Sequence, residues 1–124
     1  MQEIDEYDFL LIRGDVFHLD MGLTLSFVDV FENPEAYVAK LVLRDDQDDT
    51  LTPRLTLTAT PEVESIDPGV SSPPAAVVMF RFTASAAETQ ALPQWNLVGY
   101  AELRTAVGDT VIERLFNSRV TVGD

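Results

Sequence analysis

The stretch FHLDMGLTLSF, residues 17–27, decides the fold of this chain. Successive side chains of a β-strand point to opposite faces, so an apolar residue at every second position predicts a strand with one buried face. On a helix the same apolar groups would be spread around the circumference without forming a stripe. The rest of the chain must therefore supply a second layer that covers one face of this strand. The apolar positions are Phe17, Leu19, Met21, Leu23, Leu25 and Phe27.

Length and composition indicate one globular domain. The chain has 124 residues, of which 46% are hydrophobic and 23% charged, as in an ordinary globular protein. No apolar run approaches the roughly 20 residues of a membrane-spanning helix. The first residues are acidic, unlike a secretory signal, so we expect a protein that is made and used in a cytoplasm.

Two further features of the composition exclude classes of function. The chain contains no cysteine, which rules out disulfides, thiolate metal sites and cysteine nucleophiles. The formal net charge is −13, so the phosphates of a nucleic acid would be repelled over most of the surface. We therefore expect neither nucleic acid nor a membrane among the partners.

Short strands separated by turn signals predict an all-β fold, namely an immunoglobulin-like two-sheet β-sandwich of about seven strands. Residues 1–8 are predicted to form an acidic N-terminal arm and residues 9–124 a single sandwich domain. In immunoglobulin order, the first, second, fifth and fourth strands form one sheet, and the third, sixth and seventh form the other. The predicted strands are residues 9–12, 16–28, 37–44, 51–59, 75–83, 95–104 and 110–122.

Two connections and the core can also be predicted. Ser85-Ala86-Ala87-Glu88 has the pattern of a helix capping box, so one short helical turn is expected between the fifth and sixth strands. The segment from Thr60 to Pro74 is predicted to be a loop, long for a compact domain. The predicted core includes Phe17, Leu19, Met21, Leu23, Leu41, Leu55, Phe80, Phe82 and Leu103.

The sequence resembles the immunoglobulin-like domain of tailed-phage structural proteins, typified by the N-terminal domain of upper baseplate proteins. The resemblance covers about residues 9–122. It rests on an Arg-Gly-Asp opener before a long alternating strand, on a Ser-Ala-x-x-Thr-x-x-Leu-Pro turn, and on short strand motifs. These pieces are Arg13 to Asp15, Val16 to Phe27, Arg44, Ser85 to Pro93, Tyr100 with Glu102, and Val120 to Val122. The chain departs from the pattern at Trp95, where the family usually has glycine, and at Leu97, where it often has tyrosine.

The resemblance implies a non-enzymatic structural protein of a tailed-phage particle, in the tail, baseplate or neck. Its partners would be other virion structural proteins in multiple symmetry-related copies, and its location the virion, assembled in the host cytoplasm. The chain ends soon after Val122, so we expect no receptor-binding portion. One alternative is a capsid decoration protein of the same fold. Another is a cytoplasmic small-ligand-binding domain or an enzyme, which would need a pocket with converging polar groups.

Three residue patterns suggest sites but have simpler explanations. Arg13-Gly14-Asp15 is interpreted as a tight turn in which glycine adopts a positive φ, rather than as an integrin-type tripeptide. His18, the only histidine, has Asp20 on the same face, yet no serine lies in a nucleophile context. The run from Asp45 to Asp49 could gather around Ca²⁺, but it lacks the glycine and glutamate of an EF-hand loop and is interpreted as a solvated link. No catalytic residue, cofactor or metal is predicted.

The outward face of the third and sixth strands is the predicted docking surface. It combines aliphatic and aromatic side chains with basic ones, whereas the acidic residues are concentrated in loops and in the N-terminal arm. Such a composition is typical of a protein interface. The alternative is that the N-terminal arm or the long loop covers this face within the same chain. The predicted docking residues are Val38, Lys40, Val42, Arg44, Val98, Tyr100 and Arg104.

Overall fold

The structure is a computed structural model, and it describes residues 6–25, 29–46, 50–67 and 75–124. Eight strands lie in these ranges: β1 Glu6–Ile12, β2 Phe17–Leu25, β3 Tyr37–Arg44, β4 Leu55–Ala59, β5 Glu62–Asp67, β6 Ala75–Ala84, β7 Leu97–Thr105 and β8 Val111–Gly123. They also contain three short helical segments, α1 Asp29–Glu32, η1 Pro34–Ala36 and α2 Ala86–Gln90.

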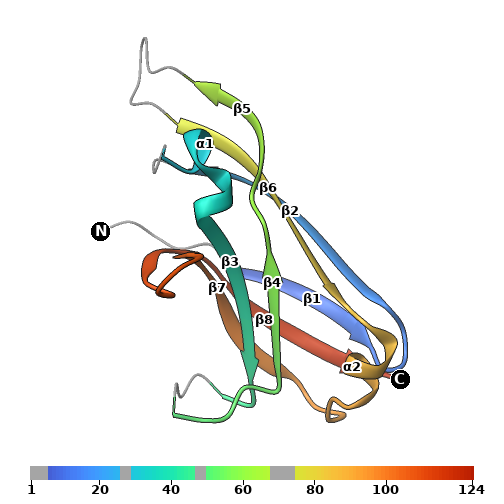
Figure 1. Ribbon diagram of the computed structural model, residues 1–124. Helices are drawn as coiled ribbons and strands as arrows, with labels where there is room; N and C mark the ends of the chain where they lie inside the picture. The colour runs from blue at the N-terminus through green and yellow to red at the C-terminus, as the bar shows by residue number, and fades with distance from the viewer. Residues whose placement is uncertain (1–5, 26–28, 47–49, 68–74) are drawn as a thin grey trace.

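The strands form two sheets (Figure 1). The five-stranded sheet has the order β1-β8-β7-β3-β4, and the three-stranded sheet has the order β2-β6-β5. All neighbouring strands are antiparallel except β1 and β8, which are parallel. Buried residues from both sheets form one hydrophobic cluster. The predicted all-β fold, an immunoglobulin-like two-sheet sandwich, is therefore confirmed.

The predicted assignment of strands to sheets is wrong for two of them. The first strand, β1, pairs with β8, and the fourth, β4, pairs with β3, where Leu57 lies opposite Leu41. Both strands therefore belong to the sheet predicted for the third, sixth and seventh strands. Alternation of apolar residues shows which face of a strand is buried, but it does not show which neighbour the strand bonds to.

Strand β5 lies inside the segment from Thr60 to Pro74 that was predicted to be a loop. It pairs with β6 and takes the place in the small sheet that was predicted for β4. Its acidic residues and the surrounding prolines have the composition of a loop, which explains why the strand was missed. The remainder of the predicted loop, residues 68–74, lies outside the described residues.

Two other predicted boundaries differ from the structure. Strand β1 begins at Glu6 rather than Phe9, so residues 6–8, assigned to the acidic arm, belong to the sandwich. The ring of Tyr7 packs edge-on against Phe116, with 5.5 Å between the ring centroids. The predicted extension of the long strand to Val28 falls on residues 26–28, which lie outside the described residues.

The core lies between β6 and the central strands of the large sheet. Five of the nine predicted core residues are buried, namely Leu41, Leu55, Phe80, Phe82 and Leu103. The four from β2 are only partly buried and pack against this cluster; they are Phe17, Leu19, Met21 and Leu23. Because β2 is an edge strand with β6 as its single hydrogen-bonded neighbour in the described sheet, it is covered less completely than the sequence suggested.

Two connections that cross between the sheets meet at one end of the sandwich. The turn after β1 passes to β2 in the small sheet, and α2 leads from β6 to β7 in the large sheet. The backbone N–H of Gly14 donates to Thr89 Oγ1 at 3.1 Å, and Thr89 Oγ1 donates to the carbonyl of Asp15 at 2.7 Å. Gly14 has φ 85°, as the predicted tight turn requires. The two motifs that carry the resemblance are thus one structural unit.

The predicted capping box at the start of α2 is confirmed. Ser85 Oγ accepts the N–H of Glu88 at 3.1 Å, and the Glu88 carboxylate accepts the N–H of Ser85 at 3.0 Å. These two bonds satisfy backbone donors that the short helix cannot satisfy itself. The box therefore fixes where α2 begins and how it approaches the turn after β1.

We predict that Phe80→Ala destabilises the fold far more than Phe17→Ala. Phe80 is 0% exposed in the central strand of the small sheet, so its truncation should cost about 3–5 kcal/mol. Phe17 on the edge strand is only partly buried and has less contact to lose. Chemical denaturation of both variants measures the difference. Equal losses of unfolding free energy would contradict the placement of β2 at the edge of the core.

Candidate functional site

The predicted docking residues share the outer face of the five-stranded sheet. In the pairing of β3 with β7, Val38 lies opposite Arg104 and Arg44 lies opposite Val98. Side chains of residues that lie directly opposite each other project from the same face of a sheet. The intervening inward positions of both strands are buried, as at Leu41 and Leu103. The face deduced from alternation is therefore the one that the structure presents.

On one half of this face, the basic side chains form ion pairs with acidic residues of the same chain. The Lys40 ammonium lies 2.9 Å from Asp109 Oδ1, and the Arg104 guanidinium lies 3.3 Å from Asp109 Oδ2 and 2.9 Å from Glu102 Oε1. The hydrogen bond from Lys40, together with the nearby Arg104 charge, lowers the pKa of Asp109. Asp109 has φ 52° in the turn between β7 and β8. This turn therefore holds Lys40 and Arg104 against the sheet.

Two side chains that alternation points outward are buried on this face, one in each half. Glu102 is 8% exposed between Arg104 and Arg114, and the Arg114 guanidinium lies 3.5 Å from Glu102 Oε2. Val42, which lies opposite Tyr100, is only 9% exposed, so its side chain offers little surface to a partner. Long basic side chains can cover apolar groups with their stems, which explains such burial on an outer face.

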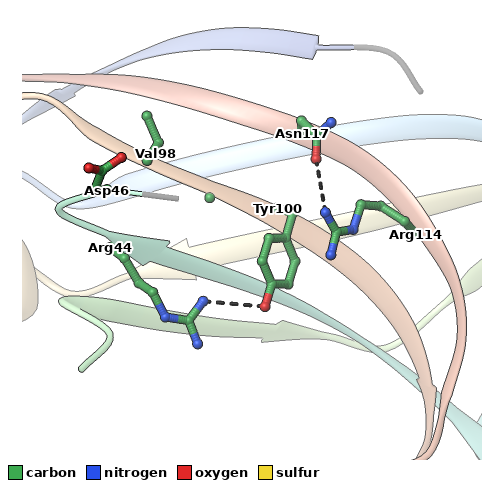
Figure 2. Close-up of a pocket in the computed structure, with 7 residues that line it drawn as sticks. Arg44, Asp46, Val98, Tyr100, Arg114 and Asn117 are labelled. Carbon is green, nitrogen blue, oxygen red and sulfur yellow. Dashed lines mark hydrogen bonds between the residues drawn. The ribbon is translucent and has the colours of Figure 1, made fainter. Parts of the chain in front are cut away.

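The other half of the face contains a hollow of about 180 Å³ (Figure 2). Tyr100 stands between two guanidinium groups. The Arg114 guanidinium carbon lies 3.8 Å from the ring centroid, and Arg44 Nη1 donates to the Tyr100 hydroxyl at 3.3 Å. Both arginines have second contacts, because Arg44 donates to the carbonyl of Leu51 and Arg114 donates to Asn117. The lining residues are Arg44, Asp46, Val98, Gly99, Tyr100, Arg114 and Asn117.

Gly99 lets the two strands at the base of this hollow approach each other closely. A Cβ atom built at Gly99 would lie 1.8 Å from the carbonyl oxygen of Val42. Real Cβ atoms do not approach backbone oxygen so closely, so any larger residue would have to push β7 away from β3. The glycine thereby fixes the spacing of the strands that carry Arg44 and Tyr100.

Arg114 and Asn117, which come from β8, were missed by the sequence analysis. Strict alternation from the buried Phe116 would point Arg114 inward. The register instead shifts, so that Ala101 pairs with Phe116 and Glu102 pairs with Arg114. The skipped residue, Leu115, forms a β-bulge that turns Arg114 to the outer face. A second bulge lies at Ile112, where Leu103 pairs with Glu113 and Arg104 pairs with Val111.

Basic residues are concentrated on this outer face in a strongly acidic chain. Five of the eight lysines and arginines in the sequence lie on it: Lys40, Arg44, Arg104, Arg114 and Arg119. Arginine, tyrosine and valine side chains lie next to one another on this surface. Such a set can bind a partner's side chains. The hollow of about 180 Å³ is smaller than the roughly 300–1,000 Å³ of typical small-molecule pockets.

A second cluster lies beyond the ends of three strands. Asp45 follows β3, Arg54 precedes β4 and Trp95 precedes β7. Arg54 donates to both carboxylate oxygens of Asp45 at 2.9 and 2.8 Å, and Trp95 Nε1 donates to Asp45 Oδ1 at 3.0 Å. Hydrogen bonds from Arg54 first, and then from Trp95, lower the pKa of Asp45. The Asp45 carboxylate therefore stays ionised and keeps its hydrogen bonds to Arg54 and Trp95.

The other sequence patterns are not brought together into sites. The Asp20 carboxylate pairs with Arg81 at 3.4 Å, while His18 is exposed beside it. Residues 47–49 of the aspartate-rich run lie outside the described residues, and Asp45 is bound to Arg54. Among the described residues, no group of three or more histidine, cysteine, aspartate or glutamate side chains could hold a metal ion.

No protein-family model matches the sequence, and none of the curated proteins matches it. Within the described ranges, none of the helices has the length and apolar character needed to cross a membrane.

We predict that Trp95 fluorescence remains constant on acidification until the pH falls below the ordinary aspartate pKa of about 3.9. A depressed pKa keeps Asp45 ionised below that range, and its stabilising contribution is lost only as the pH falls through the folded-state value. Trp95 is the single tryptophan, so its emission reports this cluster alone.

The matched control is Asp45→Asn, which has no carboxylate to titrate and should lack this transition. Far-UV circular dichroism of both proteins separates a local change from acid unfolding. A fluorescence transition above pH 4 in the native chain, or the same transition in Asp45→Asn, would show that the carboxylate does not hold the indole.

Proposed function

We propose that this chain is a non-enzymatic structural protein of a tailed-phage particle, in the tail, baseplate or neck, that docks onto other virion proteins. The docking surface is the open half of the outer face, at Arg44, Val98, Tyr100 and Arg114. The observation that carries the proposal is the Arg–Tyr–Arg stack on this face, which is held in place before any partner arrives.

Three features support docking through this surface. Tyrosine and arginine are the residue types enriched at the centres of protein interfaces. Their side chains are held by contacts to Leu51 and Asn117, so less rotamer freedom is lost on binding. The basic residues also contrast with the net charge of −13, which favours one orientation of an approaching acidic partner surface.

Assignment to a phage particle is supported by the sequence resemblance. The Arg13-Gly14-Asp15 turn and the helix that follows Ser85 contact each other through Thr89, so these motifs form one structural feature of the sandwich. A structural role in a symmetric particle would place the domain in multiple copies. The same fold on the capsid surface would be a decoration protein, and the position of the chain in the particle distinguishes the two roles.

The test is incorporation into the particles of a phage that encodes the chain. We predict that Val98→Asp and Tyr100→Asp fold normally but are absent from purified particles analysed by mass spectrometry. Both positions lie on the open half of the outer face, where a new negative charge opposes an acidic partner surface. The matched control is Thr83→Asp, an exposed position on β6 in the other sheet.

Each result of this experiment bears on the proposal. Exclusion of both variants together with incorporation of Thr83→Asp would support docking through the outer face. Normal incorporation of both variants would refute the docking surface. Absence of the native chain from purified particles would refute the structural role altogether. Circular dichroism of the isolated variants confirms that any exclusion does not result from misfolding.

A further inference from the structure

The free edge of β2 is the least protected strand edge in the described part of the sandwich. β2 lies at one side of the small sheet, with β6 beside it and β5 at the other side (Figure 1). Its register with β6 continues over all nine of its residues without a bulge. It contains no proline, lysine or arginine. An unbroken edge strand presents a row of backbone N–H and C=O groups with which another strand can pair.

The other strand edges of the two described sheets have features that discourage such pairing. β5 has a bulge and two exposed carboxylates, Glu62 and Glu64. β4 has only five residues. β1 has exposed carboxylates at Glu6 and Asp8. Bulges, short strands and charged side chains are the devices with which natural proteins prevent association of sheet edges.

Apolar side chains along the β2 edge are incompletely covered. Leu19 lies opposite the fully buried Phe82, so the odd-numbered side chains of β2 point toward the five-stranded sheet. All of them except Leu25 are only partly buried, whereas the even-numbered side chains are exposed. A strand added beside β2 would therefore bury apolar surface in addition to completing the backbone hydrogen bonds. The partly buried residues are Phe17, Leu19, Met21 and Leu23.

Strand β2 is complementary to a second, antiparallel copy of itself. When Met21 of one copy faces Met21 of the other, all nine residues of each strand have a partner. Apolar residues then face apolar residues on the inner side, and no like charges face each other on the outer side. The pairs are Phe17 with Leu25, Leu19 with Leu23, Met21 with Met21, His18 with Thr24, and Asp20 with Gly22.

The neighbouring antiparallel registers are less favourable. A pairing centred on Asp20 places two carboxylates directly opposite each other. A pairing centred on Gly22 leaves the first residues of β2 without a partner on the strand. A slip by one residue sets the apolar face of one copy beside the polar face of the other. In the pairing centred on Met21, Gly22 leaves space opposite Asp20, whose carboxylate keeps its ion pair with Arg81.

We propose that two copies of this chain associate through the β2 edge, so that their small sheets form one continuous sheet in a two-fold symmetric dimer. The same residues then serve both copies, as such symmetry requires. Each copy carries a net charge of −13, so the two copies repel each other and added salt should strengthen the dimer by screening this repulsion. The contact leaves the proposed docking face on the other sheet open, so the two proposals are independent.

Sedimentation velocity of the full chain at low and high salt tests the dimer. The fraction of dimer should rise with salt concentration. Gly22→Asp places a second carboxylate opposite Asp20 at both symmetry-related positions, and it should raise the dissociation constant on the order of tenfold. Gly22→Lys places an opposite charge there and should lower the dissociation constant. A Cβ atom at Gly22 would lie 3.7 Å from the terminal methyl group of Met79, an ordinary contact distance that the fold tolerates.

Thr83→Asp and Thr83→Lys are the matched controls. They make the same changes of net charge at an exposed position on β6, one strand away from the edge. Each should change the dissociation constant less than the corresponding Gly22 variant does. Val98→Asp, on the proposed docking face, should affect the dimer no more than Thr83→Asp does. Circular dichroism of each variant establishes that the sandwich is intact.

The register has a direct chemical test, because the sequence contains no cysteine. Directly opposite residues of antiparallel strands have Cα atoms about 4.5–5.5 Å apart, within the range that a disulfide spans. Oxidation of Met21→Cys should therefore produce a covalent dimer on a non-reducing gel. Val107→Cys, at a position that is 90% exposed in the turn between β7 and β8, measures random collisions and should cross-link much more slowly.

Four results would overturn the proposal. These are a chain that remains monomeric in high salt, Gly22 variants that associate as the Thr83 controls do, Met21→Cys that cross-links no faster than Val107→Cys, and slower hydrogen exchange of the β2 amides only when another protein is added to a monomeric chain. The last result would assign the β2 edge to a strand of a different partner.

Discussion

One buried hydroxyl joins the two connections on which the arrangement of the sheets depends. Thr89, 0% exposed in α2, accepts a hydrogen bond from Gly14 and donates one to the carbonyl of Asp15. The turn and the helix cross between the sheets in opposite directions along the chain. Arg13 adds a bond to the carbonyl of Gln90 at 3.3 Å. Contacts at one end of the sandwich, away from the outer face, therefore fix the positions of the strands that carry this face.

The candidate surfaces follow from how this acidic chain distributes its few basic residues. On one half of the outer face, Lys40 and Arg104 form ion pairs with acidic groups of the same chain. On the other half, Arg44 and Arg114 lie beside a tyrosine and frame a hollow. At the strand ends, an arginine holds an exposed tryptophan. In each case an arginine orients its neighbours, because a planar guanidinium can stack and donate in several directions.

Alternating apolar residues were sufficient to predict the class of fold and the faces of most strands. Leu41, Leu55 and Phe80 are buried as their spacing requires. Alternation could not assign β4 to a sheet, because both sheets bury one face. It also could not reveal the bulge that turns Arg114 outward, since a bulge depends on the pairing of two strands rather than on one strand's pattern. The contacts of Trp95 likewise join loops that are distant in the sequence.

The most direct test of this account is the unfolding free energy of Thr89→Val, which keeps the shape of the side chain and removes its hydroxyl. We expect a loss of about 1–3 kcal/mol, because the partners of the hydroxyl at Gly14 and Asp15 lose a buried hydrogen bond. Faster hydrogen exchange of the Gly14 amide should accompany it. The exposed Thr121→Val, on β8, serves as the control and should change stability by no more than about 0.5 kcal/mol. Equal stabilities of Thr89→Val and the native chain, with an unchanged Gly14 amide, would contradict the account.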